Sequence, residues 1–329
     1  MHDGCSQGAV EKTKVVDFVK RFGSVQKIFL IGALIGVVIL MTCLNPRFLS
    51  FENILNISRQ MSINLVIAVG MTFCIISGGI DLSVGSIGIM AGCLTGLVLD
   101  SSNSVVLALG VGLLSGILFG GINGVIIAKL RVTPFICTLG TMTVARGIAL
   151  WVTGGDIIGG FPEAFNFIGV GFIGGMPVPV IITAIVVVLG WILLSKTEFG
   201  LGTYAIGGNF KAARLAGLKN DNILIKIYTL AGFLAAVGGI ILTARVVSAQ
   251  PALMQTTNMD CIAAVVVGGT SLMGGSGTMM NTVLGSILMA CLINGLNIIG
   301  IGYEWQLMVI GVIIIIAVAL DMLSHRKEV

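Results

Sequence analysis

Charged residues are scarce in this sequence. Asp, Glu, Lys and Arg make up 10% of its 329 residues, compared with about 25% in an ordinary soluble domain. Because a soluble surface of this size needs more charge to cover it, the composition argues against a large soluble enzyme. The net charge of +4 is spread along the chain and forms no basic face, which argues against nucleic acid as a partner.

Other residue types that define common protein classes are also scarce or unsuitably placed. Aromatic residues make up 6% of the chain, and only six residues are proline. The chain is too apolar for disorder and lacks the triplet period and the proline content of collagen. The seven cysteines form no CxxC pair, so they indicate packing residues and neither a disulfide framework nor a zinc site. A long polar and basic stretch precedes Ile28, which is unlike a signal peptide.

Apolar residues and glycine are abundant instead. Hydrophobic residues make up 56% of the chain, and 47 residues are glycine. Several uncharged runs approach or exceed the roughly 20 residues that a helix needs to cross a bilayer, and they are continuous, unlike the alternating strands of a membrane β-barrel. We therefore predict an all-α polytopic membrane protein with about ten transmembrane helices. The predicted spans are residues 28–44, 61–80, 83–99, 104–127, 135–153, 177–194, 224–244, 256–270, 279–299 and 305–321.

The basic residues predict how these spans are oriented. Lysines and arginines cluster before the first span and after the last one, so both termini are expected in the cytoplasm and the number of spans is even. Ten spans also place the basic residues of the connection 195–226 on the cytoplasmic side. We therefore expect a cytoplasmic tail at 1–27, a transmembrane domain at 28–321 and a second cytoplasmic tail at 322–329. Four basic residues lie elsewhere: Arg47, Arg59, Arg146 and Arg245.

A nine-residue pattern occurs twice in the chain. The segment Gly78–Ser86 resembles Gly268–Ser276, and each follows one apolar span and precedes another. Transporters are often built from two such duplicated halves. A true duplication and a chance match in a glycine-rich chain both stay open.

The connection 195–226 is the longest predicted cytoplasmic loop. Asn209 is a suitable N-cap for a short helix over residues 210–216, and Gly217 suits the position that follows its C-cap. A capped helix of two turns at the cytoplasmic face would be explained by docking of a soluble partner. An ordinary helix lying at the membrane interface is the alternative.

The motifs of common enzymes are incomplete. The stretch Gly268–Gly277 resembles a phosphate-binding loop, but no lysine lies between Lys226 and Lys327, and that loop needs one to reach the phosphates. The G-x-S-x-G match at residues 4–8 lies in a polar tail without the preceding strand that a hydrolase requires. We therefore expect no catalytic residues, no bound cofactor and no metal in this chain.

Ionisable residues in or beside the spans are candidates for function, because they are costly in a membrane. Asp81 opens the third span, where it could cap amide groups and stabilise the helix dipole. Arg146 lies near the middle of the fifth span, about 17 Å along the helix, and should face the bundle interior, a pore or a carboxylate. Asp260 and Arg245 lie near outer ends of spans and are either paired or solvated.

Several motifs together resemble the ribose-type ABC sugar-importer permeases. The resemblance runs in order from about Asn45 to Asp321, although residues 252–259 lack the glycine-rich stretch and the acidic residue that many relatives carry there. This segment is predicted to face outside, so the difference puts ribose itself in doubt but not sugar import. The matching motifs are Ala68–Thr72, Gly78–Ser86, Thr133–Ile136, Thr138–Thr141, Arg146–Gly147, Tyr204–Asn209, Ala212–Gly217, Ser248–Pro251, Asp260–Val265, Gly268–Leu272 and Asn294–Asn297.

The resemblance implies the parts of a complete transporter in the inner membrane of a bacterium. Two permease copies, identical or different, would pair among membrane lipids and associate with two ABC ATPase subunits that bind the ATP and Mg²⁺. A periplasmic or tethered sugar-binding protein would deliver a monosaccharide. The residues implied to couple the permease to the ATPase are Asn209, Lys211, Ala212, Ala213, Arg214 and Gly217.

The sugar would pass along small and polar residues inside the helix bundle. Candidates for this pathway are Asp81, Thr138, Thr141, Arg146, Asn294 and Asn297. A secondary transporter driven by an ion gradient is the alternative, and it predicts clustered carboxylates in the membrane. A structural or assembly protein, which would need no ATPase, is a third possibility.

Overall fold

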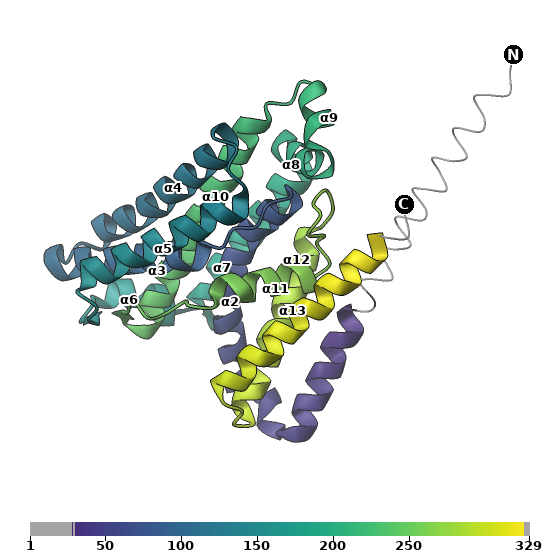
Figure 1. Ribbon diagram of the computed structural model, residues 1–329. Helices are drawn as coiled ribbons and strands as arrows, with labels where there is room; N and C mark the ends of the chain where they lie inside the picture. Colours follow the sequence, from purple (N-terminus) through teal and green to yellow (C-terminus); the bar gives the residue numbers. More distant parts are fainter. Residues whose placement is uncertain (1–27, 29, 326–329) are drawn as a thin grey trace, which may run out of the picture.

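The computed structural model describes residue 28 and residues 30–325, and most of this part of the chain is helical (Figure 1). The predicted all-α fold class is confirmed. The predicted cytoplasmic tail 1–27 and the last four residues of the predicted tail 322–329 lie outside the described residues.

Each of the ten predicted spans overlaps one apolar helix of the described chain. Seven helices are long and apolar enough to cross a membrane, and three are shorter. The long ones are α2 (Phe51–Ile76), α3 (Val84–Ser102), α4 (Val105–Lys129), α5 (Pro134–Thr153), α7 (Val178–Lys196), α10 (Asn220–Val246) and α12 (Met279–Ile298). The shorter ones are Leu30–Leu44, α11 (Thr257–Val267) and the apolar part, Tyr303–Ala319, of α13 (Tyr303–His325).

The eighth predicted span is shorter than expected. It corresponds to α11, whose 11 residues reach about 16 Å, roughly half of the 30 Å hydrocarbon core. The backbone leaves the helical conformation on both sides, at Met254 with a φ of 56° and at Gly269 with a φ of 95°. This crossing is therefore a broken helix and not a continuous one.

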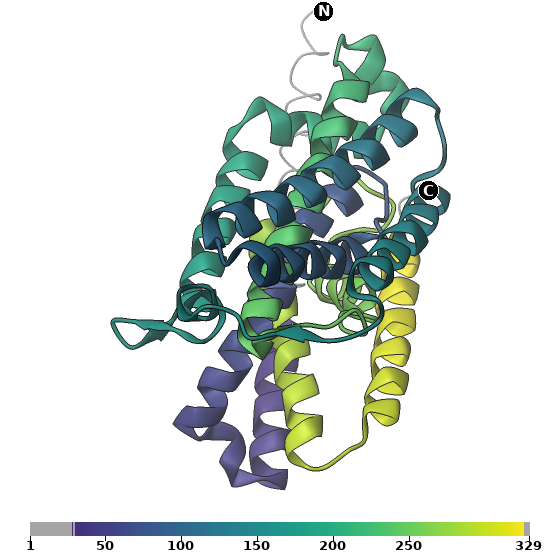
Figure 2. The same cartoon turned by 90° about the vertical axis from the view of Figure 1, so that its left-hand side faces the viewer.

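Short elements connect the spans. They are the 3₁₀ helix η1 (Pro46–Leu49), the helices α6 (Glu163–Val170), α8 (Glu198–Gly208) and α9 (Phe210–Leu215), and the strands β1 (Ile158–Gly159), β2 (Phe172–Ile173), β3 (Met176–Pro177) and β4 (Ser248–Ala249). The strand β1 pairs antiparallel with β4, and β2 pairs antiparallel with β3. The β2–β3 hairpin projects from the molecule (Figure 2).

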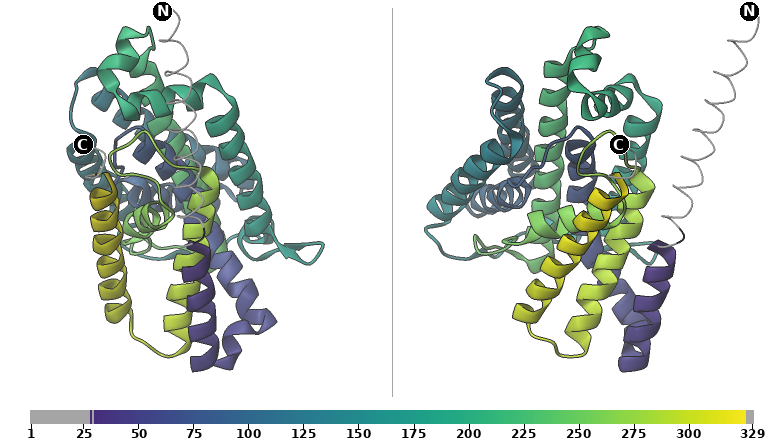
Figure 3. Two further views of the ribbon diagram at one scale, coloured as in Figure 1. Left: turned by 90° about the vertical axis from the view of Figure 1, so that its right-hand side faces the viewer. Right: turned by 45° about the vertical axis from the view of Figure 1, so that its right-hand side comes forward.

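The helices form an inner and an outer set. At least two thirds of the most apolar stretch is buried in α2, α3, α10 and α12, whereas less than a third is buried in α4, α5 and α7. The helix α10 runs through the middle of the bundle and packs against α2, α3 and α4 (Figure 1). The helix Leu30–Leu44 packs against α12 at one side (Figure 3).

Alternate connections meet at the same end of the bundle. At the α9 end, the amide of Gly275 donates to the carbonyl of Ile76 at 2.8 Å, and the loop after α4 forms an ion pair with the start of α10. At the opposite end, β1 pairs with β4, and the side-chain amide of Asn53 donates to Oδ1 of Asn294 at 2.9 Å. This alternation agrees with ten successive crossings. That the α9 end faces the cytoplasm stays a prediction.

The two similar nine-residue segments lie in contact at the α9 end. Each begins with the same turn: the amide of Gly79 donates to Cys74 at 2.9 Å, and that of Thr270 donates to Val265 at 3.2 Å. The matching turn residues are Gly78 and Gly269, both with positive φ. The structural match is therefore shifted by one residue from the sequence match, in which Gly78 corresponds to Gly268.

Candidate functional site

The short helix α9 is capped at both ends as predicted. Oδ1 of Asn209 accepts a hydrogen bond from the amide of Ala212 at 2.9 Å. At the other end, Gly217 has a φ of 88° and its amide donates to Arg214 at 3.1 Å. Because only the left-handed conformation closes this turn, glycine is well suited to that position. The caps fix the length and direction of a helix too short to be stable alone.

One side of α9 points away from the protein. Ala213 is buried against the rest of the chain, whereas Leu215 is 90% exposed. We call the exposed residues of α9 and of the turn after it the α9 surface; they are Lys211, Ala212, Arg214, Leu215, Ala216 and Gly217. A leucine this exposed, beside the basic residues Lys211 and Arg214, is available for contact with another protein.

Three side chains hold α9 to the bundle. Oδ1 of Asp221, at the start of α10, lies 3.0 Å from Nη2 of Arg131, which follows α4. The guanidinium of Arg131 lies 5.5 Å from the ring centroid of Phe210. The side-chain amide of Asn220 donates to the backbone carbonyl of Phe210 at 2.8 Å. Sequence reasoning missed these residues, because no local pattern links the loop after α4 with residue 210.

Replacing Arg131 by alanine is expected to loosen α9 while leaving the helix bundle folded. It removes a cation–π contact and a partly exposed ion pair, each worth about 0.5–1 kcal/mol. Amide exchange over residues 209–217, measured by mass spectrometry, should therefore speed up several-fold. Lys129 is the control, since its Nζ lies 3.7 Å from Asp221 and its side chain is 56% exposed. Equal protection of α9 in both alanine variants would contradict this account.

Glycines at the end of α8 contact two loops of the bundle. A side chain on Gly207 would overlap the carbonyl of Ile76 and lie 2.6 Å from the amide of Gly275. The hydroxyl of Tyr204 donates to the carbonyl of Gly277 at 2.7 Å, and burial raises the pKa of this hydroxyl, so that it stays a donor at neutral pH. We call this contact of α8 with the α2–α3 loop and the α11–α12 loop the glycine junction. It joins the element before α9 to the segments that connect α2 with α3 and α11 with α12.

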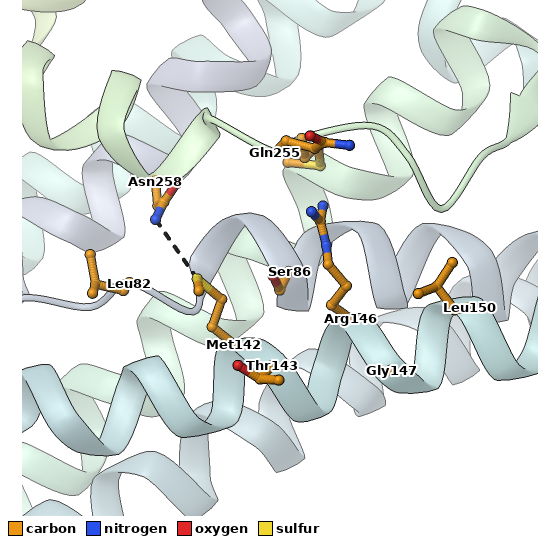
Figure 4. Close-up of a pocket in the computed structure, with 10 residues that line it drawn as sticks. Leu82, Ser86, Met142, Thr143, Arg146, Gly147, Leu150, Gln255 and Asn258 are labelled. Carbon is orange, nitrogen blue, oxygen red and sulfur yellow. Dashed lines mark hydrogen bonds between the residues drawn. The ribbon is translucent and has the colours of Figure 1, made fainter. Parts of the chain in front are cut away.

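A cavity of about 310 Å³ lies between α3, α5 and the start of α11 (Figure 4). Its walls combine apolar side chains with a few polar ones. They are Leu82, Ser86, Met142, Thr143, Arg146, Gly147, Leu150, Met254, Gln255 and Asn258.

Arg146 connects α5 with the chain before α11. Its Nη2 donates to the carbonyl of Leu253 at 3.1 Å, and its Nε is buried without a hydrogen-bond partner. In Figure 4 its side chain rises from α5 toward the segment that carries Gln255. The prediction that this arginine faces the interior or a pore agrees with the geometry. Its partner is a backbone carbonyl and not a carboxylate.

The segment before α11 turns into the bundle. That residues 252–259 face the outer side of the membrane stays a prediction. Met254 and Asn258 of this segment are buried. The reason is the close approach of α3: a side chain on Gly85 would lie 2.8 Å from the carbonyl of Met254, and one on Gly88 would lie 2.9 Å from its Cε. Only a glycine-bearing face of α3 lets this backbone come so near.

Asp81 belongs to a buried polar cluster near the start of α3. Its Oδ1 accepts hydrogen bonds from the amide of Ser83 at 2.8 Å and from the hydroxyl of the same residue. The Ser83 hydroxyl in turn accepts from the side-chain amide of Asn123 in α4 at 2.9 Å. Asp81 therefore bonds the amide of Ser83, the N-cap residue of α3, and not an amide within the helix as the expected capping role requires. No partner is found for Oδ2 among the described residues.

The other predicted pathway residues bond within the protein. Thr138 accepts from the amide of Leu82 at 3.1 Å, and Thr141 bonds to carbonyls of its own helix. The amide of Gln306 donates to Asn297 at 2.8 Å, while Asn294 bonds to Asn53 as described above. Of the six predicted residues, Arg146 is the one that lines the cavity. The roles of all six in transport stay predictions.

Ion pairs are few in the described chain. Both involve Asp221, so Asp260 and Arg245 do not form the pair considered from the sequence. The described residues also contain no group of three or more His, Cys, Asp or Glu side chains arranged to hold a metal.

Comparison with known proteins identifies the family. Residues 53–318 match the family described as branched-chain amino acid transport system / permease component. The ribose import permease protein RbsC of Bacillus subtilis is 46% identical over 301 residues, which cover 91% of this chain and 94% of the relative. The ribose import permease of Haemophilus influenzae is 43% identical over 314 residues, which cover 94% of this chain and 97% of the relative.

More distant relatives carry the names of other sugars. The L-arabinose transport system permease protein AraH of Escherichia coli is 37% identical over 283 residues, or 86% of each chain. The search of solved structures gave no match. The long matches over both chains show that this protein belongs to the transport-system permease family that includes the ribose, galactose and arabinose import permeases.

Proposed function

We propose that this chain is the membrane permease of a bacterial ABC importer for a monosaccharide, ribose or a related sugar. ATP hydrolysis would take place in separate ATPase subunits that bind ATP and Mg²⁺, so the chain itself would not be an enzyme. The names of the relatives support the sugar, since two relatives that are 46% and 43% identical are ribose import permeases. The observation that carries the coupling is the α9 surface, a capped helix with an exposed leucine and basic residues at one end of the bundle.

The mechanism follows from how α9 is connected. An ATPase seated on the α9 surface would push or release this helix when its own subunits close on ATP. Arg131, Asn220 and the glycine junction connect α9 and α8 to the bundle. Because packed helices move as rigid bodies, such a push would tilt α3 and α11 and alternate the opening of the bundle. The α9 end and both termini would then lie in the cytoplasm of the cell, and the sugar-binding protein would meet the opposite end.

A second permease copy would cover α5. This helix is as exposed as α4 and α7, with 22%, 22% and 28% of their most apolar stretches buried, but its mean hydropathy is 1.5, against 2.4 and 2.7. Exposed residues of α4 and α7 are mostly large and aliphatic, whereas α5 exposes Gly140, Thr143 and Gly147 among its large apolar side chains. A surface of this kind suits a pathway shared with a partner helix better than contact with lipid tails.

Uptake into vesicles tests the proposal directly. The chain is purified with the ATPase and binding protein encoded beside it and reconstituted, and uptake of labelled ribose, arabinose and galactose is measured. We expect uptake to depend on ATP and to survive an ionophore. Uptake that ignores ATP and collapses with the ionophore would show an ion-coupled secondary transporter instead.

Reversing the charge of Arg214 tests the coupling surface in the same system. Arg214→Glu should separate ATP hydrolysis from uptake, because it places a like or unpaired charge in the contact with the ATPase. Lys219→Glu is the matched control, since Lys219 is also exposed but precedes α10 and lies outside α9. If Arg214→Glu leaves both hydrolysis and uptake unchanged, α9 is not the coupling helix.

A further inference from the structure

Irregular backbone reaches the middle of the bundle beside the cavity. Arg146 lies twelve residues after Pro134, the start of α5, which is about 18 Å along a helix some 30 Å long. At this depth its guanidinium holds the carbonyl of Leu253. Non-helical backbone at membrane depth occurs where it is buried in protein or lines a water-filled space. In transporters, helices broken in this way often form the place where the solute binds.

The cavity offers hydrogen-bond donors without a carboxylate. The Nε of Arg146 is buried and unpartnered, and no contact of the Gln255 side chain within the described chain occupies its amide. The amide of Asn258 has only a weak contact with the sulfur of Met142 at 4.0 Å. None of the residues that line the cavity is acidic. Such a site suits a solute rich in oxygen acceptors and disfavours a cation.

The remaining walls suit the carbon skeleton of a sugar. Leu82, Met142, Leu150 and Met254 supply apolar surface, and the volume of about 310 Å³ is large enough for one monosaccharide. A hydroxylated ring presents C–H faces as well as oxygens, so it can use both kinds of wall. A purely apolar solute would leave the guanidinium of Arg146 without compensation.

The wall formed by Met254 is held in a strained conformation. Its φ of 56° is unusual for a residue with a side chain, and its close contacts with Gly85 and Gly88 of α3 keep it there. Met254 also precedes α11. The loop before α3 and the loop after α11 both belong to the glycine junction at the α9 end. A movement of α8 would therefore change the shape of this cavity.

We propose that the cavity between α3, α5 and α11 holds the transported monosaccharide during its passage, with Arg146, Gln255 and Asn258 donating hydrogen bonds to its oxygens. This inference rests on the proposed function and specifies where the sugar is held. Thr143, Gly147 and Leu150 line the cavity and are exposed on α5, so a second copy that covers α5 would complete the enclosure.

A change at Gln255 tests the site with little risk to the fold, because this side chain is exposed. Gln255→Met keeps the size of the side chain and removes its donor. In the reconstituted transporter we expect ATP-driven uptake to fall about two- to tenfold, as for the loss of one hydrogen bond, while hydrolysis and binding to the sugar-binding protein are unchanged. The fall should be smaller for a deoxy sugar that lacks the hydroxyl met by Gln255. Val188→Thr, on the exposed face of α7 and away from the cavity, should leave uptake as it was.

Protection from labelling provides a readout that does not depend on transport. In Gln255→Cys, a small thiol reagent should modify the new cysteine, and saturating ribose, arabinose or galactose should slow that modification. Mass spectrometry locates the label among the native cysteines. Met273→Cys is the control, since Met273 is 60% exposed in the α11–α12 loop and should react equally with and without sugar.

If wild-type uptake requires ATP but no sugar protects residue 255 and Gln255→Met imports at the wild-type rate, the sugar site is wrong while the importer stands. If wild-type vesicles show no ATP-driven uptake, both fail.

Discussion

Alanine at position 207 is expected to abolish ATP-driven uptake while the ATPase still binds and hydrolyses ATP. The added methyl group would overlap the carbonyl of Ile76 and approach the amide of Gly275 to 2.6 Å. Both neighbours are backbone atoms, one at the end of α2 and one in the α11–α12 loop, so no side chain can swing aside. The end of α8 must therefore move off the two loops, at a cost of about 1–3 kcal/mol. Because the α9 surface itself is unchanged, docking of the ATPase should persist.

The neighbouring glycine provides a matched control. A methyl group on Gly208 would meet no atom within 4 Å, so Gly208→Ala should transport like the wild type. Both substitutions add the same group to adjacent residues at the end of one helix. A difference between them therefore reports the contact and not the helix propensity of alanine.

A milder variant protects this experiment against simple misfolding. Tyr204→Phe keeps the ring and removes the hydrogen bond to Gly277, which is worth about 1 kcal/mol. Uptake per ATP hydrolysed should fall by a smaller factor, with normal assembly by gel filtration. If both Gly207→Ala and Tyr204→Phe import sugar at the wild-type rate, the glycine junction does not carry the movement of α9.

The sequence was sufficient to predict the elements that depend on local or periodic patterns. Apolar runs separated by glycine, proline and charge predict ten spans, and each overlaps a helix of the structure. The cap at Asn209 and the turn at Gly217 likewise depend on residues a few positions apart. Such features follow from the chain near each residue, so one sequence suffices.

Features that join distant segments could not be predicted in this way. The glycine junction brings residues 76, 207 and 275 together, and the cavity combines helices that start at residues 84, 134 and 257. Nothing in the pattern around Arg146 indicates that its partner is the carbonyl of Leu253. Small polar residues such as Thr138 and Asn294 looked suitable for a pathway, but the same residue types also bond helices together.

Turns and loops account for only part of the glycine in this chain, because other glycines lie inside helices. In α4, glycines recur at every fourth position, so they lie on one face of the helix. A side chain on Gly116 would overlap the carbonyl of Gly232 in α10, and one on Gly124 would lie 2.7 Å from Cα of Ile225. This face lets the backbones of α4 and α10 approach closely, as small residues do in many membrane helices.

Leucine at position 120 is therefore expected to disrupt the packing of α4 on α10. Even the first carbon of the new side chain would overlap the carbonyl of Tyr228 and lie 3.0 Å from Cα of Gly232, so the two helices would have to separate. Since α10 is the central helix of the bundle, we expect the folded state to lose about 3 kcal/mol or more. The variant should show a lower melting temperature in detergent and little protein in the membrane fraction.

A glycine on the exposed side of α4 provides the control, because it distinguishes the loss of helix packing from the effect of the Gly→Leu substitution itself. A side chain on Gly110 would meet nothing within 4 Å, so Gly110→Leu only adds an apolar group where α4 is already exposed and should be tolerated. It makes the same substitution in the same helix, ten positions earlier. Equal melting temperatures for Gly110→Leu and Gly120→Leu would mean that α4 and α10 do not meet through this glycine face. A loss confined to Gly120→Leu would show that much of the glycine in this chain serves to bring helix backbones together around α10.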